Sequence, residues 1–293
     1  MIRIGYAGVN MELPTASRTF RIAGYSVRRM LDTASANIAA LDRILRWNSR
    51  HGIHLFRITS NLIPFGSHPI NTGEWIMCLG GDLRKIGRFI RENRMRVSMH
   101  PGQYAVLNSP RDEVYSNTLR DLRYHRSVLS LMGLDSGHKI VIHGGGAYRD
   151  KEGSARVLAC RLALLDTRIR RRLVLENDER VFTAEDIFAV CRQTGIPGVL
   201  DVFHHQVLPS FPGLSTREVI LMFASTWAGQ RQKIHYSGQE PGKMRGGHST
   251  AVDFAEFERF YEEIRGLDLD IMIESKDKQA SVLALRERFP GLA

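Results

Sequence analysis

The sequence predicts one α/β domain over residues 1–293, folded as a (β/α)8 barrel, the TIM barrel. Eight short β-rich runs alternate with helical patterns from one end of the chain to the other. The strand-and-helix units average about 37 residues, which suits a barrel whose usual size is about 250 residues. Polar residues that can bind metal ions follow most of these runs directly. No Pro/Ser-rich linker, low-complexity stretch or internal repeat interrupts the pattern, so a single domain is expected.

The strands are expected where short runs rich in apolar and β-branched residues stand between polar or glycine-containing segments. In chain order they are residues 2–7, 54–59, 96–100, 138–143, 172–177, 198–202, 233–237 and 271–275. The intervening helices are indicated by apolar residues spaced by three and four. Examples are Ile38, Leu41, Ile44 and Leu45, then Leu83, Ile86, Phe89 and Ile90, then Ile187, Val190 and Cys191. Helix ends are predicted from capping boxes at Thr183 with Asp186 and at Ser215 with Glu218, and from a helix stop at Gly195.

A doubly wound sheet is the competing α/β architecture. Such a sheet binds its ligands at one switch point, whereas this chain carries polar residues after nearly every strand. In a barrel, the C-terminal ends of all eight strands surround one mouth, so residues that follow the strands meet there. Two long connections, residues 8–35 and 60–80, are expected to rise over this mouth.

The composition restricts the class of protein. The chain is 43% hydrophobic and 25% charged, as folded globular proteins are, and its net charge of +10 favours an anionic partner, nucleic acid ahead of membrane. Basic charge that merely maintains solubility is the alternative. No window approaches the roughly 18 apolar residues of a membrane span, and the N-terminus lacks a signal-peptide pattern. Cys78, Cys160 and Cys191 have no CxxC spacing, which fits a reducing compartment. We expect a cytoplasmic, nucleoid-associated prokaryotic protein with no membrane contact and no obligate protein partner.

Nine histidines and acids are candidate metal ligands, because each stands at a strand end or in a loop above the mouth. They are His68, His100, His143, Glu176, Asp201, His204, His235, His248 and Glu274. Singly, each has a plain structural explanation, but one shared site explains all of them together. Imidazole and carboxylate ligands without cysteine suit Zn²⁺, Mn²⁺ or Fe²⁺. Nine ligands indicate three ions, with Glu176 as a bridging carboxylate. The remaining histidines are expected to be structural: His51, His54, His125, His138 and His205.

Lys233 lies two residues before His235, so both side chains point to the same side of their strand, into the barrel. A buried lysine among cations is expected to be neutral, paired with a bound anion, or converted to a carbamate. Bound metal ions lower the pKa of a water ligand and stabilise the charge of a phosphoryl transition state. A basic protein with such a site is therefore expected to be a phosphodiesterase that acts on nucleic acid.

Motifs along essentially the whole chain resemble those of the UV damage endonucleases, TIM-barrel DNA-repair nucleases related in fold to endonuclease IV. They are IGYA with Asn10, NLIPFGSHP, MHPGQY, IHGGG, LENDE, LDVFHH, KIHYS, GGHS around His248, and IESKDK. The resemblance implies up to three divalent ions, Mn²⁺ foremost with Zn²⁺ or Mg²⁺ as alternatives, bound by the nine candidate ligands. It also implies a carboxylated Lys233. Gln103 and Tyr104 would wedge into the duplex opposite the lesion, while Tyr6 and Asn10 would line the damage site.

The function expected from the residues and the resemblance together is a metal-dependent DNA repair endonuclease. It would nick damaged double-stranded DNA immediately 5′ to cyclobutane dimers and 6-4 photoproducts through attack by a metal-bound hydroxide. Glu176, Lys233 and His235 are the expected catalytic residues. The alternatives are an abasic-site nuclease of the endonuclease IV type, a two-metal sugar isomerase barrel and a non-catalytic DNA-binding module. The basic composition and the excess of histidines over acids argue against the isomerase.

Overall fold

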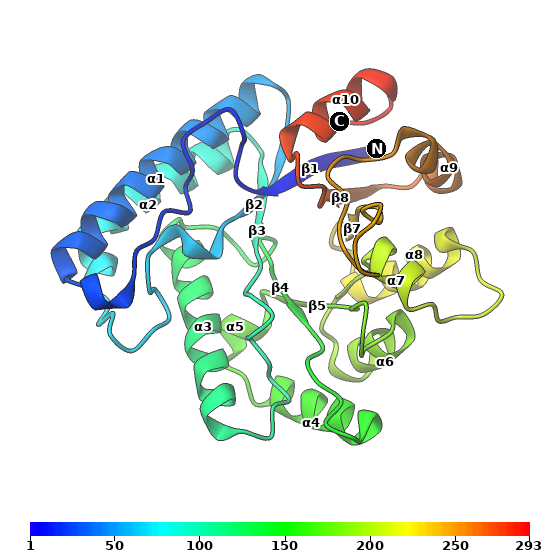
Figure 1. Ribbon diagram of the computed structural model, residues 1–293, viewed down its shortest axis with the longest axis horizontal. Helices are drawn as coiled ribbons and strands as arrows, with labels where there is room; N and C mark the ends of the chain where they lie inside the picture. The colour runs from blue at the N-terminus through cyan, green and yellow to red at the C-terminus, as the bar shows by residue number, and fades with distance from the viewer.

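The computed structural model describes residues 1–293, in which eight parallel strands form a barrel with the helices on its outside (Figure 1). The strands are β1 (Ile2–Gly8), β2 (Leu55–Ile58), β3 (Arg96–Met99), β4 (Ile140–His143), β5 (Leu173–Glu176), β6 (Gly198–Val199), β7 (Lys233–Tyr236) and β8 (Leu269–Ile273). Each strand overlaps the run predicted for it, and the predicted fold class is confirmed.

The barrel is nearly closed, and the pairing of its strands is sparse in two places. The first is between β3 and β4, where only Met99 and Ile140 are paired. Hydrogen-bonded ladders join the strands in the order β6-β5-β4-β3-β2-β1-β8-β7. At the second, between β6 and β7, the pairing is reduced to a single parallel bridge between Asp201 and His235, in which the His235 amide donates to the Leu200 carbonyl at 2.9 Å. The strand predicted over residues 198–202 is too long, because the chain turns into a helix at Asp201.

The outer layer consists of ten α-helices and three 3-10 helices. The α-helices are α1 (Val27–Arg50), α2 (Glu74–Glu92), α3 (Asp112–Leu131), α4 (Lys151–Ala163), α5 (Thr167–Arg170), α6 (Ala184–Thr194), α7 (Val202–Val207), α8 (Thr216–Ala224), α9 (Phe254–Ile264) and α10 (Gln279–Arg288). The 3-10 helices are η1 (Ile22–Gly24), η2 (Ser60–Leu62) and η3 (Ser225–Trp227). Both predicted capping boxes are present, at the starts of α6 and α8, and Gly195 ends α6 with a φ of 70°.

The two long connections are shorter than predicted, because helices begin inside the expected ranges 8–35 and 60–80. Helix α1 begins at Val27, where the Ser26 hydroxyl caps it, and α2 begins at Glu74. Parts of both connections still lie at the mouth of the barrel, beside the candidate site described below.

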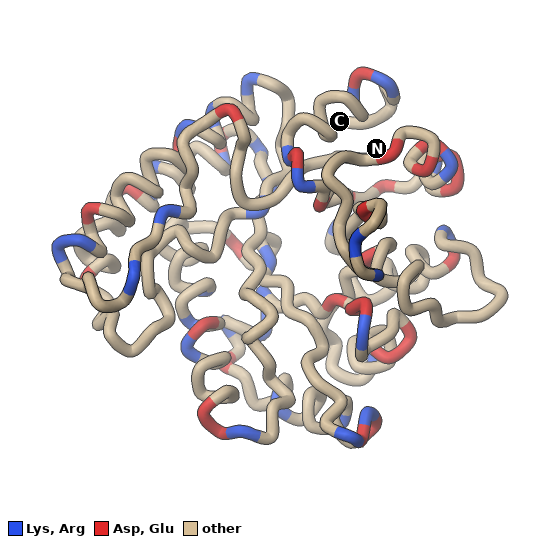
Figure 2. Tube along the Cα trace, viewed as in Figure 1, with Lys and Arg blue, Asp and Glu red and all other residues tan.

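The largest apolar cluster contains 65 buried residues from the strands and the helices packed on them. The predicted apolar faces of α1, α2 and α6 belong to it, apart from Phe89, which packs against its edge. Lys and Arg residues are spread over the helices and loops instead of gathering in one segment (Figure 2). None of the helices combines the length and apolar character that a membrane crossing requires.

Candidate metal centre

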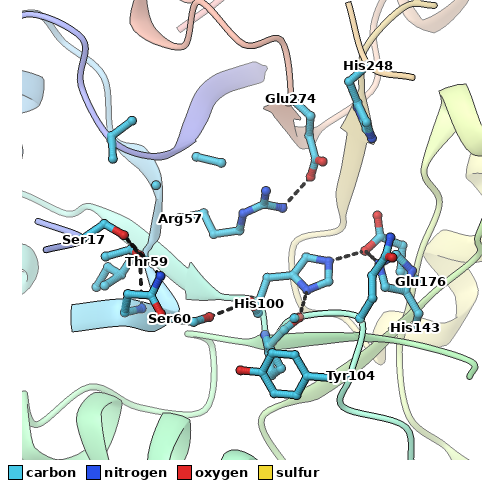
Figure 3. A pocket seen from close by; sticks show the side chains of 18 of the residues that line it. Ser17, Arg57, Thr59, Ser60, His100, Tyr104, His143, Glu176, His248 and Glu274 are labelled. Atoms are coloured by element: carbon cyan, nitrogen blue, oxygen red, sulfur yellow. Dashed lines mark hydrogen bonds and ion pairs between the residues drawn. The ribbon is translucent and has the colours of Figure 1, made fainter. Parts of the chain in front are cut away.

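A cavity of about 680 Å³ opens at the C-terminal ends of the strands (Figure 3). Its lining residues come from the end of each of the eight strands or from the connection that follows it. Six of the nine predicted ligands line the cavity: His100, His143, Glu176, His204, His248 and Glu274. Asp201 and His235 lie fully buried beneath them. Parallel strand direction explains the convergence, because all eight C-terminal ends share one face of the barrel.

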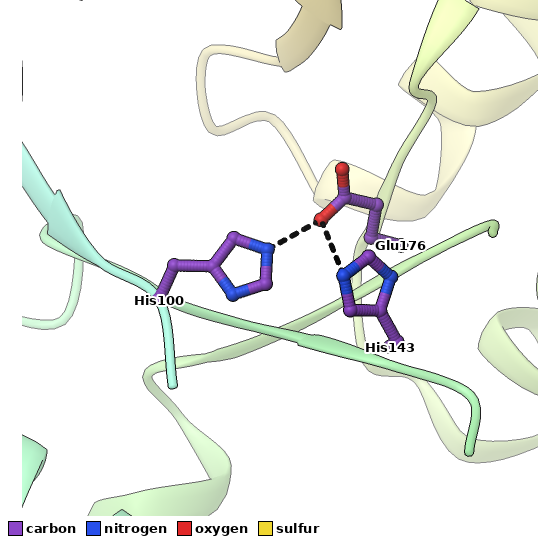
Figure 4. Close-up of side chains that lie close together, drawn as sticks. All are labelled: His100, His143 and Glu176. Atoms are coloured by element: carbon purple, nitrogen blue, oxygen red, sulfur yellow. Dashed lines mark hydrogen bonds and ion pairs between the residues drawn. The ribbon is translucent and has the colours of Figure 1, made fainter. Parts of the chain in front are cut away.

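Glu176 ends β5 and lies at the centre of the cluster, with 1% of its side chain exposed. Its Oε2 is 2.8 Å from Nε2 of His100 and 4.0 Å from Nε2 of His143 (Figure 4). Its Oε1 is 2.6 Å from Nδ1 of His235. One carboxylate therefore contacts imidazoles from three other strand ends, which is a geometry suited to a bridging ligand.

A second group of ligand atoms adjoins Glu176. One atom each from Glu176, Asp201, His235 and Glu274 lies within 4.8 Å of the others. Glu274 Oε1 is 3.0 Å from His235 Nδ1 and 2.5 Å from Nη1 of Arg57. Asp201 Oδ1 accepts the amide hydrogen bond that caps α7, and Oδ2 has no partner. Asp201 is therefore a helix cap through one oxygen and keeps the other for the cluster.

Three buried atoms of the cluster have no hydrogen-bond partner in the protein: His143 Nδ1, Asp201 Oδ2 and His235 Nε2. Leaving a buried polar atom unsatisfied costs about 1–3 kcal/mol. Imidazole nitrogens and carboxylate oxygens are ligands of Zn²⁺, Mn²⁺ and Fe²⁺, and three converging acids supply compensating negative charge. The residues present thus fit divalent metal ions.

The surroundings keep two acids of the cluster ionised. Burial opposes ionisation of Glu176, yet the neighbouring His235 and His143 hold its pKa well below the ordinary value. Burial also opposes ionisation of Glu274, and Arg57 together with His235 holds its pKa well below the ordinary value. Ionised carboxylates are the form that binds metal ions.

The histidines differ in their affinity for protons. Burial lowers the pKa of His100 to about 4, although Glu176 opposes the shift. His100 is therefore neutral at pH 7, as a metal ligand must be. Burial also disfavours the charged form of His235, but Glu176 and Glu274 outweigh it and raise the pKa of this imidazole. A proton would consequently compete with a metal ion for His235.

His204 and His248 extend the cluster toward the barrel mouth. The ring centroid of His204 is 6.0 Å from that of His143 and 5.5 Å from that of His248. The Nε2 atom of His204 lies 3.7 Å from Oε2 of Glu179, and Nδ1 of His248 is hydrogen-bonded to the Ser237 hydroxyl at 2.8 Å. These two rings line the same cavity as His143 and Glu176.

The structure does not bring His68 into the cluster. Its side chain is exposed in the connection between η2 and α2, and Nδ1 accepts a hydrogen bond from the Ile70 amide at 3.1 Å. A ligand role for His68 stays a prediction that requires this connection to move toward the other eight residues. The five histidines expected to be structural do not line the cavity: His51, His54, His125, His138 and His205.

Lys233 begins β7 and is 1% exposed. Its Nζ donates a hydrogen bond to the Ser98 hydroxyl at 3.0 Å. Burial, reinforced by Arg96 and Arg57, lowers the pKa of Lys233 to about 7, so a substantial fraction of the amine is neutral at neutral pH.

The residues expected to contact DNA divide into two pairs. Gln103 and Tyr104 are exposed at the cavity rim, with 63% of Tyr104 accessible. Tyr6 and Asn10 are instead buried, at 0% and 2% exposed, and do not line the cavity. The Tyr6 hydroxyl donates to Asn48 on α1 at 2.6 Å and accepts from Asn10 at 2.9 Å. These buried hydrogen bonds leave Tyr6 and Asn10 without free surface for the expected lesion contact.

Four charged cavity residues were not predicted from the sequence: Arg57, Glu179, Arg180 and Lys278. Arg57 interrupts an otherwise apolar strand, which is a signal of an inward-facing functional position. Glu179 belongs to the LENDE motif, in which Glu176 alone was singled out. Lys278 adopts a positive φ of 58°, a backbone conformation that no local sequence pattern predicted.

Comparisons with known proteins agree on one family. A protein-family profile described as UV-endonuclease UvdE matches residues 2–293. The chain is 36% identical over 288 residues to the UV DNA damage endonuclease of Clostridium perfringens, an alignment that covers 96% of this chain and 69% of that protein. It is 32% identical over 311 residues to the UV-damage endonuclease of Schizosaccharomyces pombe, covering 98% of this chain and 50% of that protein.

Solved structures extend the comparison to three dimensions. The crystal structure of SacUVDE is similar with a TM-score of 0.93 and 40% sequence identity, covering 98% of this chain and 99% of that one. Endonuclease IV from Thermus thermophilus has a TM-score of 0.60 at 14% identity, covering 97% of this chain and 98% of that one. At such low identity, the second similarity shows the shared barrel fold alone.

Proposed function

The chain belongs to the UV-endonuclease UvdE family, and we propose that it nicks double-stranded DNA immediately 5′ to UV photoproducts with divalent metal ions at the barrel mouth. As a member of this family it is a DNA repair endonuclease that acts on UV damage. The position of the nick, the metal ions and the roles of individual residues are parts of the proposal. The proposed place of action is the cytoplasm, at the nucleoid, where the substrate lies.

The observation that carries the proposal is the convergence of acids and imidazoles around Glu176. Three ionisable acids and His235 bring ligand atoms within 4.8 Å of one another, and three buried ligand atoms lack any protein partner. Without bound ions such an arrangement would lower the stability of the fold, because buried like charges repel and unsatisfied polar atoms cost free energy. Divalent cations would remove both penalties.

We assign roles to this chain's residues as follows. The proposed ligands are the eight clustered residues together with His68, and Glu176 bridges between ions. Bound divalent ions would supply a more acidic water and stabilise the charge that develops on the phosphate. His235 orients Glu176 and Glu274 through Nδ1 and presents its free Nε2 to the cluster. Mn²⁺ is the expected ion, with Zn²⁺ and Mg²⁺ as alternatives.

The third proposed catalytic residue is Lys233, for which we propose carboxylation. Its Nζ is buried and has Ser98 as its hydrogen-bond partner. Arg96 and Arg57 both act against a positive charge on this side chain. Carboxylation would replace that charge with an anion, which the two arginines would stabilise. An NMR signal from the protein equilibrated with isotopically labelled carbon dioxide, absent in Lys233→Gln, would support this assignment.

The proposed DNA contact is made by Gln103 and Tyr104 at the rim of the cavity. A UV photoproduct is poorly stacked and poorly paired, so extruding its bases costs less than flipping a normal pair. An aromatic ring and an amide can then occupy the vacated stack.

The experiment compares nicking of three duplexes, which carry a cyclobutane dimer, an abasic analogue or no damage. We expect Mn²⁺-loaded protein to cut the dimer duplex immediately 5′ to the lesion and leave a 3′-hydroxyl. Loss of a residue that merely supports a metal ligand costs about 10–100-fold in activity, so loss of a bridging ligand in Glu176→Gln should exceed about 100-fold while damaged-DNA binding persists. Glu152→Gln, the same substitution at an exposed position of α4, is the matched control.

Each proposed element has an outcome that contradicts it. Preferential cleavage of the abasic duplex would favour an endonuclease IV type of activity. Full turnover by Glu176→Gln would contradict a catalytic role for Glu176. Undiminished cleavage after complete chelation would show that cleavage does not need metal ions.

A further inference from the structure

A second cavity, of about 650 Å³, lies at the opposite end of the barrel from the candidate metal centre. Its lining includes Lys139, which directly precedes β4, Arg170 and Arg171, which precede β5, and Pro197, which precedes β6. Because the strands are parallel, these positions belong to the N-terminal ends of the strands. DNA bound at the mouth therefore does not reach this cavity.

The cavity is lined by cations without acids. Lys139, Arg170 and Arg171 are its charged residues, and none of its fifteen lining residues is an aspartate or glutamate. Lys139 is only 3% exposed, and its Nζ donates one hydrogen bond, to the Arg171 carbonyl at 3.0 Å. An ammonium group has three N–H donors, so two remain for another partner. The one acid that raises the pKa of Lys139 is Asp135, which lies outside the lining.

In the rest of this barrel end, the positive charges of the arginines are neutralised by a buried carboxylate. Asp270, fully buried in β8, accepts from Arg3 at 2.7 and 2.8 Å, from Arg96 at 2.8 Å and from Arg231 at 2.6 Å. The end of the barrel at which the strands begin is called the barrel floor here. In one half of this floor, a carboxylate of the protein is paired with the arginines. In the half around Lys139, the nearby carboxylate of Asp135 forms no ion pair with the cations that line the cavity. Burial together with Arg96 and Arg172 lowers the pKa of Lys139 to about 8, although Asp135 opposes the shift.

The other walls combine apolar side chains with the uncharged polar residues Ser136, Thr167, Thr194, Thr226 and Gln230. Leu165, Ile196 and Trp227 line the cavity beside the cations, and the Trp227 ring is held in place by a hydrogen bond from its Nε1 to the Gly198 carbonyl at 2.8 Å. A cavity of several hundred cubic ångströms with a few convergent polar groups has the size of a small-molecule site. The combination suits a ligand that joins an oxyanion to an apolar or aromatic part.

We infer that this cavity binds a phosphorylated small molecule with the chemistry of a mononucleotide, its phosphate held by Lys139, Arg170 and Arg171. The phosphate supplies an anion within the cavity, whose lining contains no acid. The site is independent of the metal centre and of the proposed DNA cleavage.

The test titrates the metal-loaded protein with adenosine 5′-monophosphate, inorganic phosphate and adenosine, and follows tryptophan fluorescence. Trp227 lines the cavity, whereas Trp47 and Trp75 belong to α1 and α2, so the signal reports this cavity even if phosphate also reaches the metal ions. We expect saturable binding of the nucleotide, weaker binding of phosphate and none of adenosine. Lys139→Gln and Arg171→Gln should each weaken nucleotide binding by about tenfold or more, because each removes a charged hydrogen bond.

Arg168→Gln is the matched control, because Arg168 lies on the neighbouring helix α5 but pairs with Asp166 and does not line the cavity. Its nucleotide affinity should equal that of the wild type. Arg171 is exposed, so Arg171→Gln keeps the test valid even if Lys139→Gln fails to fold. Absence of saturable nucleotide binding, or equal affinity in wild type and Arg171→Gln, would overturn the inference. Nicking of damaged DNA should be the same in wild type, Arg171→Gln and Arg168→Gln.

Discussion

Asp270 is the residue on which the barrel floor depends electrostatically, since three arginines share its one buried carboxylate. Burial opposes its ionisation, but the hydrogen bond from Arg3 and the charge of Arg96 hold its pKa below the ordinary value. The folded protein therefore favours the ionised form more strongly than the unfolded chain does. This difference links the stability of the fold to pH.

Asp270→Asn is expected to lower the free energy of unfolding at pH 7 by about 3–5 kcal/mol, because it leaves three partly buried arginines without their shared buried anion. The wild-type advantage is fully present above the unfolded-state pKa of about 3.9, and it disappears as pH falls through the lower folded-state pKa. Urea denaturation at several pH values should show the two proteins converging in acid. Asp268, which pairs with Arg231, is 68% exposed, so Asp268→Asn should change stability by less than about 1 kcal/mol. A wild-type advantage that is independent of pH would contradict the assignment.

The turn after β3 is the element that presents the proposed DNA wedge. The Gly102 carbonyl accepts from the Ala105 amide at 2.9 Å, which closes a tight turn around Gln103 and Tyr104. A Cβ atom at Gly102 would lie 2.5 Å from the Tyr104 ring, so the ring packs on a backbone position that only glycine leaves open. The turn holds two exposed side chains beside the cavity without using them in the core.

Gln103→Ala combined with Tyr104→Ala should weaken binding of dimer-containing duplex by about 10–100-fold, because base stacking on an aromatic ring contributes about 1–3 kcal/mol. Fluorescence anisotropy with damaged and undamaged duplexes measures the effect, which should be much smaller on undamaged DNA. Metal content, checked by elemental analysis, should equal that of the wild type. Equal losses on both duplexes would indicate a general phosphate contact instead of lesion recognition.

At the scale of the whole molecule, the candidate metal ligands lie beside a sparsely paired part of the barrel. Asp201 follows β6 and His235 belongs to β7, and these two strands share only one bridge. Glu176 and Glu274 contribute from the neighbouring strands β5 and β8. Ions at this position would join strands that backbone hydrogen bonds barely connect, and would also neutralise three crowded acids.

Removal of the ions with EDTA should therefore lower the melting temperature by several degrees and increase amide exchange along β6 and β7. A ligand present at about 100 times its dissociation constant contributes about 2.7 kcal/mol of stability. Calorimetry and hydrogen exchange, repeated after Mn²⁺ is restored, measure the effect and its reversal. An unchanged melting temperature with fully removed metal would argue against a stabilising cation in the cluster.

The alternation of β-rich runs with helical spacings determined the barrel from the sequence alone, because both patterns are local and repeat eight times. The placement of His100, His143, Glu176 and Glu274 after strands predicted their meeting, since parallel strands end on one face. His68 was predicted from a loop position and a family motif instead of a strand end, and it stands apart, because the direction of a loop depends on packing that no short pattern encodes.

Tertiary structure alone decided which partners each polar group has. The Tyr6 hydroxyl is bonded to Asn48, a residue 42 positions away in the chain, and Asn10 is bonded to the same hydroxyl. Arg57 reaches Glu274 across 217 positions, and the cationic cavity forms from the starts of separate strands. Hydrogen bonding and charge compensation depend on distance in space, whereas the sequence records only distance along the chain. The fold class and the meeting of most candidate ligands at one end of the barrel could therefore be predicted from the sequence. The hydrogen-bond and ion-pair partners of these groups could not.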